Sequence, residues 1–176
     1  MLARLDKVPG VVESRADWEG ELVLIRLSPG ASLDDVLAGA KSQLGSRTQR
    51  LDPESERRSL ASFRRGDRWL NSKETLDMSR HEAQVLGKKF ADHAGARARL
   101  TASQRQRLES LLTEEINAKF EKNHASGEGI GTTSEREWSE MEARFRVKAH
   151  DFMTAAEIDT VIKEIRSLIG VDTCGD

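Results

Sequence analysis

The sequence of 176 residues predicts an α+β protein: a small β-hairpin-plus-helix unit at the N-terminus, followed by a mainly helical domain of about four helices. A run rich in Val, Ile and Leu between turn signals predicts the hairpin, and four helix-start signatures from residue 79 onward predict the helices. We therefore expect a hairpin-and-helix unit at 1–51, a basic connector at 52–75, a helical domain at 76–170 and a tail at 171–176.

The composition indicates a surface-rich globular chain, because 33% of the residues are charged and 37% are hydrophobic. The longest uninterrupted apolar stretch is only residues 22–25, which excludes a membrane-spanning protein. No secretory signal follows Met1, so the expected location is the cytoplasm. The single cysteine, Cys174, excludes an intramolecular disulfide and a zinc site built from cysteines alone.

Charge is unevenly distributed along the chain. Residues 1–108 hold 20 Lys and Arg against 15 Asp and Glu, a net charge of +5, whereas residues 109–176 hold 8 against 15, a net charge of −7. Seven arginines concentrate between residues 47 and 68. A basic segment is typical of nucleic-acid binding, which we rank third among the functional hypotheses because the acidic half can neutralise the segment.

Residues 8–12 form a short extended run, residues 18–21 give a turn signal, and residues 21–27 predict a strand. Ser32 is placed to cap the helix that follows, and Gly45 is placed to end it. The expected order is strand, strand, helix.

The run LDKVPGV at residues 5–11, followed by a hairpin and an amphipathic helix, resembles the second half of a heavy-metal-associated domain. The resemblance covers about the first 50 residues and implies a ferredoxin-like βαββαβ fold. That family's metal-binding Cys-x-x-Cys has no counterpart here, so no ligand carries over and the resemblance implies a structural copy.

The connector contains one helix signature. Asp52 is an N-cap residue, Pro53 suits the first helical position and Gly66 is a stop signal, which together predict a short basic helix over 53–65. Because this helix has few apolar residues, we expect residues 46–77 to be semi-ordered, with Trp69 as an anchor.

Four capping-box signatures predict the starts of the helical domain, at Ser79, Thr101, Ser134 and Thr154. Gly95 and Gly170 are placed to stop two of these helices. Apolar residues at spacings of three and four predict the buried stripes: Ala83, Leu86, Phe90 and Ala94; Leu108, Leu111, Leu112, Ile116 and Phe120; Trp138, Met141, Phe145 and Ala149; and Ile158, Val161, Ile162, Ile165, Leu168 and Ile169.

The run LTASQ at residues 100–104, with FMTAAE at 152–157, is similar to the repeated Leu-Thr-x-x-Gln pattern of bacterial envelope stress and heavy-metal-resistance proteins. The resemblance covers about residues 100–169. It implies helical hairpins that sense metal or bind misfolded protein.

No nucleophile elbow and no Cys/His pair appears in the sequence, and the glycine-rich run 127–131 does not follow a strand, so we expect no enzyme. The leading hypothesis is a non-catalytic binding or regulatory module that acts through a protein partner or through self-association.

The second hypothesis is metal binding or sensing. No two histidines have the spacing of a helical metal pair, but an up-and-down bundle would gather His81, His124, Glu137 and Cys174 at one end. Such mixed nitrogen, oxygen and sulfur ligands suit a transition-metal ion such as zinc, copper or nickel. Apart from this ion, no cofactor is expected.

Overall fold

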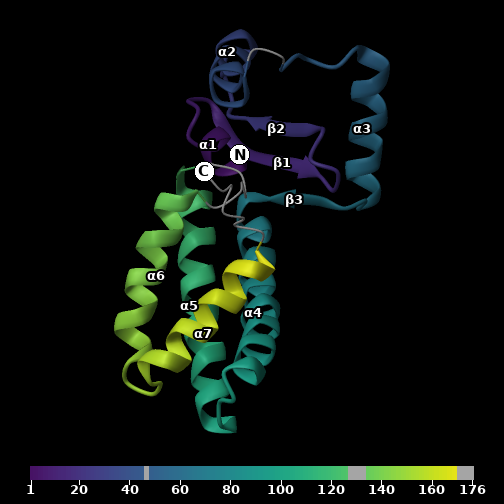
Figure 1. Ribbon diagram of the computed structural model, residues 1–176. Helices are drawn as coiled ribbons and strands as arrows, with labels where there is room; N and C mark the ends of the chain where they lie inside the picture. Colours follow the sequence, from purple (N-terminus) through teal and green to yellow (C-terminus); the bar gives the residue numbers. More distant parts are fainter. Residues whose placement is uncertain (46–47, 127–133, 170–176) are drawn as a thin grey trace. The chain divides into compact units, whose positions relative to one another are not determined.

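The computed structural model describes residues 1–45, 48–126 and 134–169 and confirms the α+β class (Figure 1). The elements are α1 (Leu2–Leu5), β1 (Val11–Asp17), β2 (Val23–Leu27), α2 (Leu33–Leu44), α3 (Pro53–Arg65), β3 (Trp69–Asn71), α4 (Ser72–Arg97), α5 (Ala102–Ser126), α6 (Glu135–Ala149) and α7 (Ala155–Leu168). The chain divides into two compact units, with the first ending at Met78 and also holding the end of α5 from Lys122. The second, helical unit holds the rest of α4 and α5 together with α6 and α7.

The N-terminal unit is built on a three-stranded antiparallel sheet of order β2-β1-β3. The predicted hairpin is confirmed, and its turn is closed by Asp17, whose Oδ1 accepts the Leu22 N–H at 2.9 Å. Ser32 caps α2 by accepting the Asp35 N–H, and Gly45 ends that helix as predicted.

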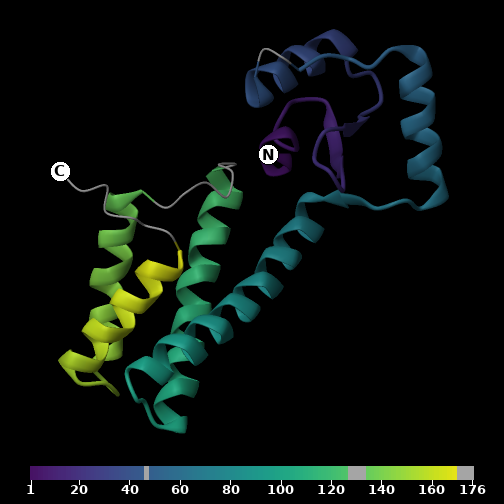
Figure 2. The same ribbon diagram turned by 45° about the vertical axis from the view of Figure 1, so that its right-hand side comes forward.

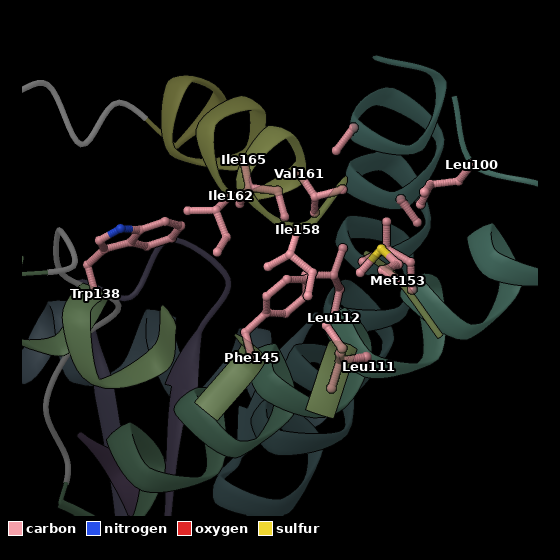
Figure 3. Packing of buried hydrophobic residues seen from close by; sticks show 14 residues of the cluster. Leu100, Leu111, Leu112, Trp138, Phe145, Met153, Ile158, Val161, Ile162 and Ile165 are labelled. Atoms are coloured by element: carbon pink, nitrogen blue, oxygen red, sulfur yellow. The ribbon is translucent and has the colours of Figure 1, made fainter. Parts of the chain in front are cut away.

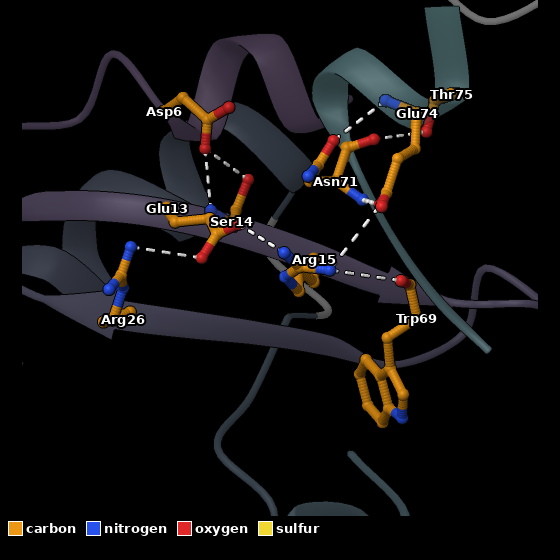
Figure 4. Close-up of polar contacts among 9 residues, drawn as sticks. All are labelled: Asp6, Glu13, Ser14, Arg15, Arg26, Trp69, Asn71, Glu74 and Thr75. Carbon is orange, nitrogen blue, oxygen red and sulfur yellow. Dashed lines mark hydrogen bonds and ion pairs between the residues drawn. The ribbon is translucent and has the colours of Figure 1, made fainter. Parts of the chain in front are cut away.

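A polar cluster ties the short helix α1 to the central strand (Figure 4). The fully buried Ser14 donates from its backbone N and its Oγ to Asp6 Oδ1, at 2.8 and 2.7 Å. Leu2, Leu5, Ala16 and Ala40 form the small apolar core beside it. These hydrogen bonds and this small core together hold α1 against β1.

Residues 52–75, expected as a connector, belong to the folded N-terminal unit. The helix predicted over 53–65 is confirmed as α3, with Asp52 at its N-cap and Gly66 in the left-handed region at its C-cap. Beyond it, β3 pairs with β1, and Trp69 is only 7% exposed. The indole Nε1 of Trp69 donates to Ser62 Oγ at 3.2 Å, and Phe63 packs edge-on against the ring, so apolar docking orders this polar stretch.

The helix starts at Thr101, Ser134 and Thr154 are confirmed, each with reciprocal hydrogen bonds to the Gln or Glu three residues later. The start expected at Ser79 is wrong, because α4 begins at Ser72. Asn71 and Glu74 form the same reciprocal pair there, at 2.8 Å in both directions. None of the helices in the described parts of the chain combines the length and hydropathy that a bilayer crossing requires.

Helices α4 and α5 follow each other in the helical unit (Figure 2). Small residues of α4 form their contact. The buried residues of α4 are Ala83, Gly87, Ala91, Ala94 and Gly95. A Cβ at Gly87 would collide with Thr113 of α5, and one at Gly95 would lie 2.6 Å from Arg105 Cγ. Gly95 is therefore an interface residue within α4, and the stop predicted there is wrong.

The chain leaves α4 through Arg99, a non-glycine residue with φ of 57°. We expect Arg99→Gly to raise the free energy of unfolding of the helical unit by up to about 1 kcal/mol, because glycine adopts this conformation without the Cβ clash. Urea denaturation followed by circular dichroism measures the change. Arg97→Gly, which places glycine inside the same helix end, is the control and should destabilise the unit by a similar amount.

The core of the helical unit joins α4, α5, α6 and α7 (Figure 3). Its buried members are Ala91, Ala94, Leu100, Leu108, Leu111, Leu112, Trp138, Phe145, Ala149, Met153, Ile158, Val161, Ile162 and Ile165. The predicted stripes of α5, α6 and α7 supply most of this cluster. Burial is incomplete in each stripe: Leu86, Phe90, Ile116, Met141 and Ile169 are only partly buried. The prediction for Leu168 is wrong, because this residue near the end of α7 is 40% exposed.

Candidate functional site

An apolar groove of about 250 Å³ opens in the helical unit and is lined by all four of its helices. Leu86 and Phe90 reach it from α4, in which both side chains are only partly buried. The other apolar lining residues are Leu112, Ile116, Phe120, Trp138, Met141, Phe145, Ile162, Ile165 and Ile169. Large apolar side chains that line an open groove are a common basis for recognition of another apolar surface.

Trp138, one of the residues that line the groove, carries an unpaired polar group. The residue is 2% exposed, and its indole Nε1 is buried without a hydrogen-bond acceptor among the described residues. An unpaired buried donor costs about 1–3 kcal/mol, and this N–H belongs to a side chain that lines the groove.

The polar residues around the groove are mainly acidic: Glu82, Glu115 and Glu142 against Lys119. Glu115 is 4% exposed and accepts hydrogen bonds from Arg144 and Lys148, at 3.2 and 3.0 Å. Hydrogen bonds to Glu114 and Glu115 raise the pKa of Lys148 above its ordinary value. Glu82 is exposed and forms no ion pair within the described part of the chain.

None of the predicted metal ligands lines the groove among the described residues. His81 is exposed on α4, and His124 Nε2 lies 3.0 Å from Ser72 Oγ. Glu137 closes the capping box of α6 with Ser134 and lies 3.9 Å from Lys119 Nζ. Cys174 lies outside the described residues.

His81 and Glu137 belong to the helical unit, whereas His124 belongs to the N-terminal unit. Across residues 1–45, 48–126 and 134–169, no three His, Cys, Asp or Glu side chains gather in a group that could hold a metal ion. The glycine-rich run 127–131 and the predicted stop at Gly170 also lie outside the described residues.

No family model, curated protein or solved structure matches this chain. The likeness of residues 5–11 to heavy-metal-associated domains and that of residues 100–104 to metal-resistance proteins therefore stay hypotheses.

Most of the groove residues were predicted from the sequence as members of the buried apolar stripes. Leu86, Phe90, Met141 and Ile116 all follow helical spacing, and spacing alone does not separate a covered stripe from one that borders a groove. One feature of the sequence could have indicated the groove. The small residues of α4 predict close packing along one face of this helix, and its larger side chains lie on another face.

Proposed function

We propose that this protein is a non-catalytic binding module whose helical unit captures an amphipathic helix of a partner protein. The apolar groove with the unpartnered Trp138 N–H is the observation that carries the proposal. In helix-in-groove recognition, apolar residues at i, i+3, i+4 and i+7 of the partner enter such a groove.

The size of the groove favours side chains over a cofactor. Sites for drug-sized ligands have volumes of about 300–1,000 Å³, and this groove, at about 250 Å³, lies below that range. It suits one or two of the large apolar anchors of a partner helix. Tryptophan is also among the residues that most often dominate the binding energy of protein interfaces.

The polar groups define the chemistry of the partner. Glu82 at the rim favours lysine or arginine beside the apolar anchors, because opposite charges steer association and select partners. Glu142 is already paired with Arg146, whose Nε donates to it at 2.9 Å. The Trp138 indole requires an acceptor next to an anchor, such as a glutamine or serine oxygen or a free carbonyl at the end of the partner helix. The expected partner is therefore a basic amphipathic helix.

The test titrates the full chain with a synthetic helical peptide that carries Leu and Phe at i, i+3, i+4 and i+7, a neighbouring Gln, and Lys elsewhere. In ¹⁵N-correlated NMR spectra, the indole N–H signal of Trp138 should move, while those of Trp18 and Trp69 in the N-terminal unit stay in place. Trp138→Phe identifies the signal. A peptide with Glu in place of Lys should bind several-fold more weakly at low salt.

Leu86→Trp places a larger side chain in the groove and should weaken peptide binding at least about tenfold. A tenfold change in affinity is smaller than the contribution expected from burying one large apolar anchor. Val85→Trp is the matched control, since Val85 is adjacent in α4 but 54% exposed, and it should bind like the unaltered protein. Equal binding by both variants contradicts the proposal. A concentration-dependent dimer that moves the Trp138 signal without peptide would assign the groove to a second copy and also contradict it.

A further inference from the structure

A second hollow, of about 840 Å³, lies in the N-terminal unit between the hairpin turn and α3. Its volume falls within the range of about 300–1,000 Å³ that is typical of sites for drug-sized ligands, whereas the apolar groove of the helical unit is smaller. We propose that this hollow binds an uncharged oligosaccharide. The proposal is independent of the groove, because the hollow lies in the other unit and is lined by other residues.

The lining of the hollow has no net charge. Its charged groups are three carboxylates and three guanidinium groups, those of Asp17, Glu19, Asp67, Arg58, Arg65 and Arg68. Arg58 and Arg65 are already paired, since their Nη atoms lie 3.7 and 2.7 Å from carboxylate oxygens of Glu54 and Asp67. A lining that is neutral in sum gives neither an anion nor a cation an electrostatic advantage. The expected ligand is therefore uncharged.

Both α3 and the hairpin turn bring polar groups to the hollow that can bind such a ligand. On α3, the lining residues Ser55, Ser59 and Ser62 have spacings of four and three, so they lie on one helix face. The first and last of these hydroxyl groups accept hydrogen bonds from side chains of the same unit. Ser59 and, on the hairpin turn, Glu19 form neither a hydrogen bond nor an ion pair with any described residue. These two side chains therefore offer a free hydroxyl and a free carboxylate.

Trp18, at the hairpin turn, adds a flat apolar surface to this polar lining. The guanidinium of Arg68 lies over one face of its ring, with Cζ 3.8 Å from the ring centroid. Trp18 is nevertheless 50% exposed, so its exposed surface includes the other face of the ring. The face of an aromatic ring carries a partial negative charge, which attracts the weakly positive C–H groups of a sugar ring.

Saccharides combine the same two features as this lining. A sugar ring has a C–H face that packs on an aromatic ring, and hydroxyl groups at its edge that both donate and accept hydrogen bonds. A carboxylate such as Glu19 accepts from these hydroxyl groups, and a guanidinium such as that of Arg68 donates to them. Leu22 and Leu51 add apolar surface to the lining. A site with an exposed aromatic face, hydroxyl groups and balanced charges therefore suits a neutral oligosaccharide.

The experiment titrates the full chain with three uncharged trisaccharides: maltotriose, cellotriose and triacetylchitotriose. In ¹⁵N-correlated NMR spectra, at least one of them should move the indole N–H signal of Trp18 with a dissociation constant of about 1 mM or below. The Trp138 signal of the helical unit should stay in place. Because the lining is neutral, the affinity should be the same at about 50 and about 500 mM salt.

Calorimetry with the trisaccharide that binds then compares variants, and circular dichroism verifies that each is folded. Glu19→Gln should weaken binding several-fold, because an amide is a weaker acceptor than a carboxylate. Glu21→Gln is the matched control, since it removes the same charge from an exposed position of the same turn that does not line the hollow. Trp18→Ala should weaken binding about tenfold or more, and Trp18→Phe should retain most of the affinity, because packing on the sugar needs only a ring.

Three results would each overturn the proposal. The first is a Trp18 signal that none of the trisaccharides moves. The second is equal affinity of Glu19→Gln and Glu21→Gln, or of Trp18→Ala and the unaltered protein, because the ligand would then bind elsewhere. The third is an affinity that falls steeply with salt, which would assign the hollow to a charged ligand.

Discussion

Replacing Ile158 with alanine should lower the free energy of unfolding of the helical unit by about 2–5 kcal/mol. Ile158 in α7 is 1% exposed and belongs to the cluster that joins all four helices of that unit (Figure 3). The loss combines the transfer free energy of the removed methylene and methyl groups with the cost of the cavity that remains. Urea denaturation followed by far-ultraviolet circular dichroism measures it.

Two controls make this prediction specific. Ile158→Val removes one methyl group and should cost only about 0.5–1.5 kcal/mol. Val147→Ala, at a position 74% exposed in α6, should change stability by no more than about 0.5 kcal/mol. A loss below about 1 kcal/mol for Ile158→Ala would contradict the placement of α7 on this core.

Gly87→Val should destabilise the helical unit by about 1–3 kcal/mol. On helix propensity alone valine is slightly better than glycine, so a stabilised variant would be expected if the position were open. The first added carbon, however, would meet the backbone N and Cα of Thr113 at 3.0 and 3.1 Å, besides its side chain. Because backbone cannot rotate away, α4 and α5 must separate.

The matched control for Gly87→Val is Ala96→Val, at an exposed position of the same helix. It should cost only a few tenths of a kcal/mol, the difference in helix propensity. Thermal unfolding of the two variants compares them directly. If Gly87→Val were as stable as Ala96→Val, the close approach of α4 to α5 would be wrong.

Helix boundaries were predictable where local chemistry sets them. Asp52, Pro53 and Gly66 fix both ends of α3, because an N-cap acceptor, a ring that lacks N–H and a left-handed residue act within one turn of the chain. The start of α4 is also set by local chemistry, but the predicted start at Ser79 was wrong. Its capping residue is Asn71, whereas the signature sought was a serine or threonine.

Long-range packing was less predictable. The pairing of β3 with β1 depends on Trp69 docking against residues distant in sequence, so a polar segment with few apolar residues reads as a connector. Leu86 and Phe90 likewise have the spacing of buried residues. The face of α4 that contacts α5 is, however, the one that carries Gly87 and Gly95. Spacing identifies a helix face, whereas neighbours decide how far that face is buried.

The candidate metal ligands show the same limit. His81 and His124 fall in different units, and Cys174 lies outside the described residues, so their convergence with Glu137 stays a prediction. The groove residues differ from the metal ligands in this respect. The sequence identified most of them one by one as apolar stripe residues, and the fold shows that they border a common space.

The third strand has a consequence for the order in which the N-terminal unit assembles. Arg15 and Trp69, which meet through the β1–β3 edge, are 54 residues apart, so closing that loop costs about 3.5 kcal/mol in chain entropy beyond a constant. The β1–β2 hairpin closes over only a few residues and forms first, and three residue pairs then retain β3. A strand held by so few pairs is also the first to open, and the segment that carries α3 is released with it.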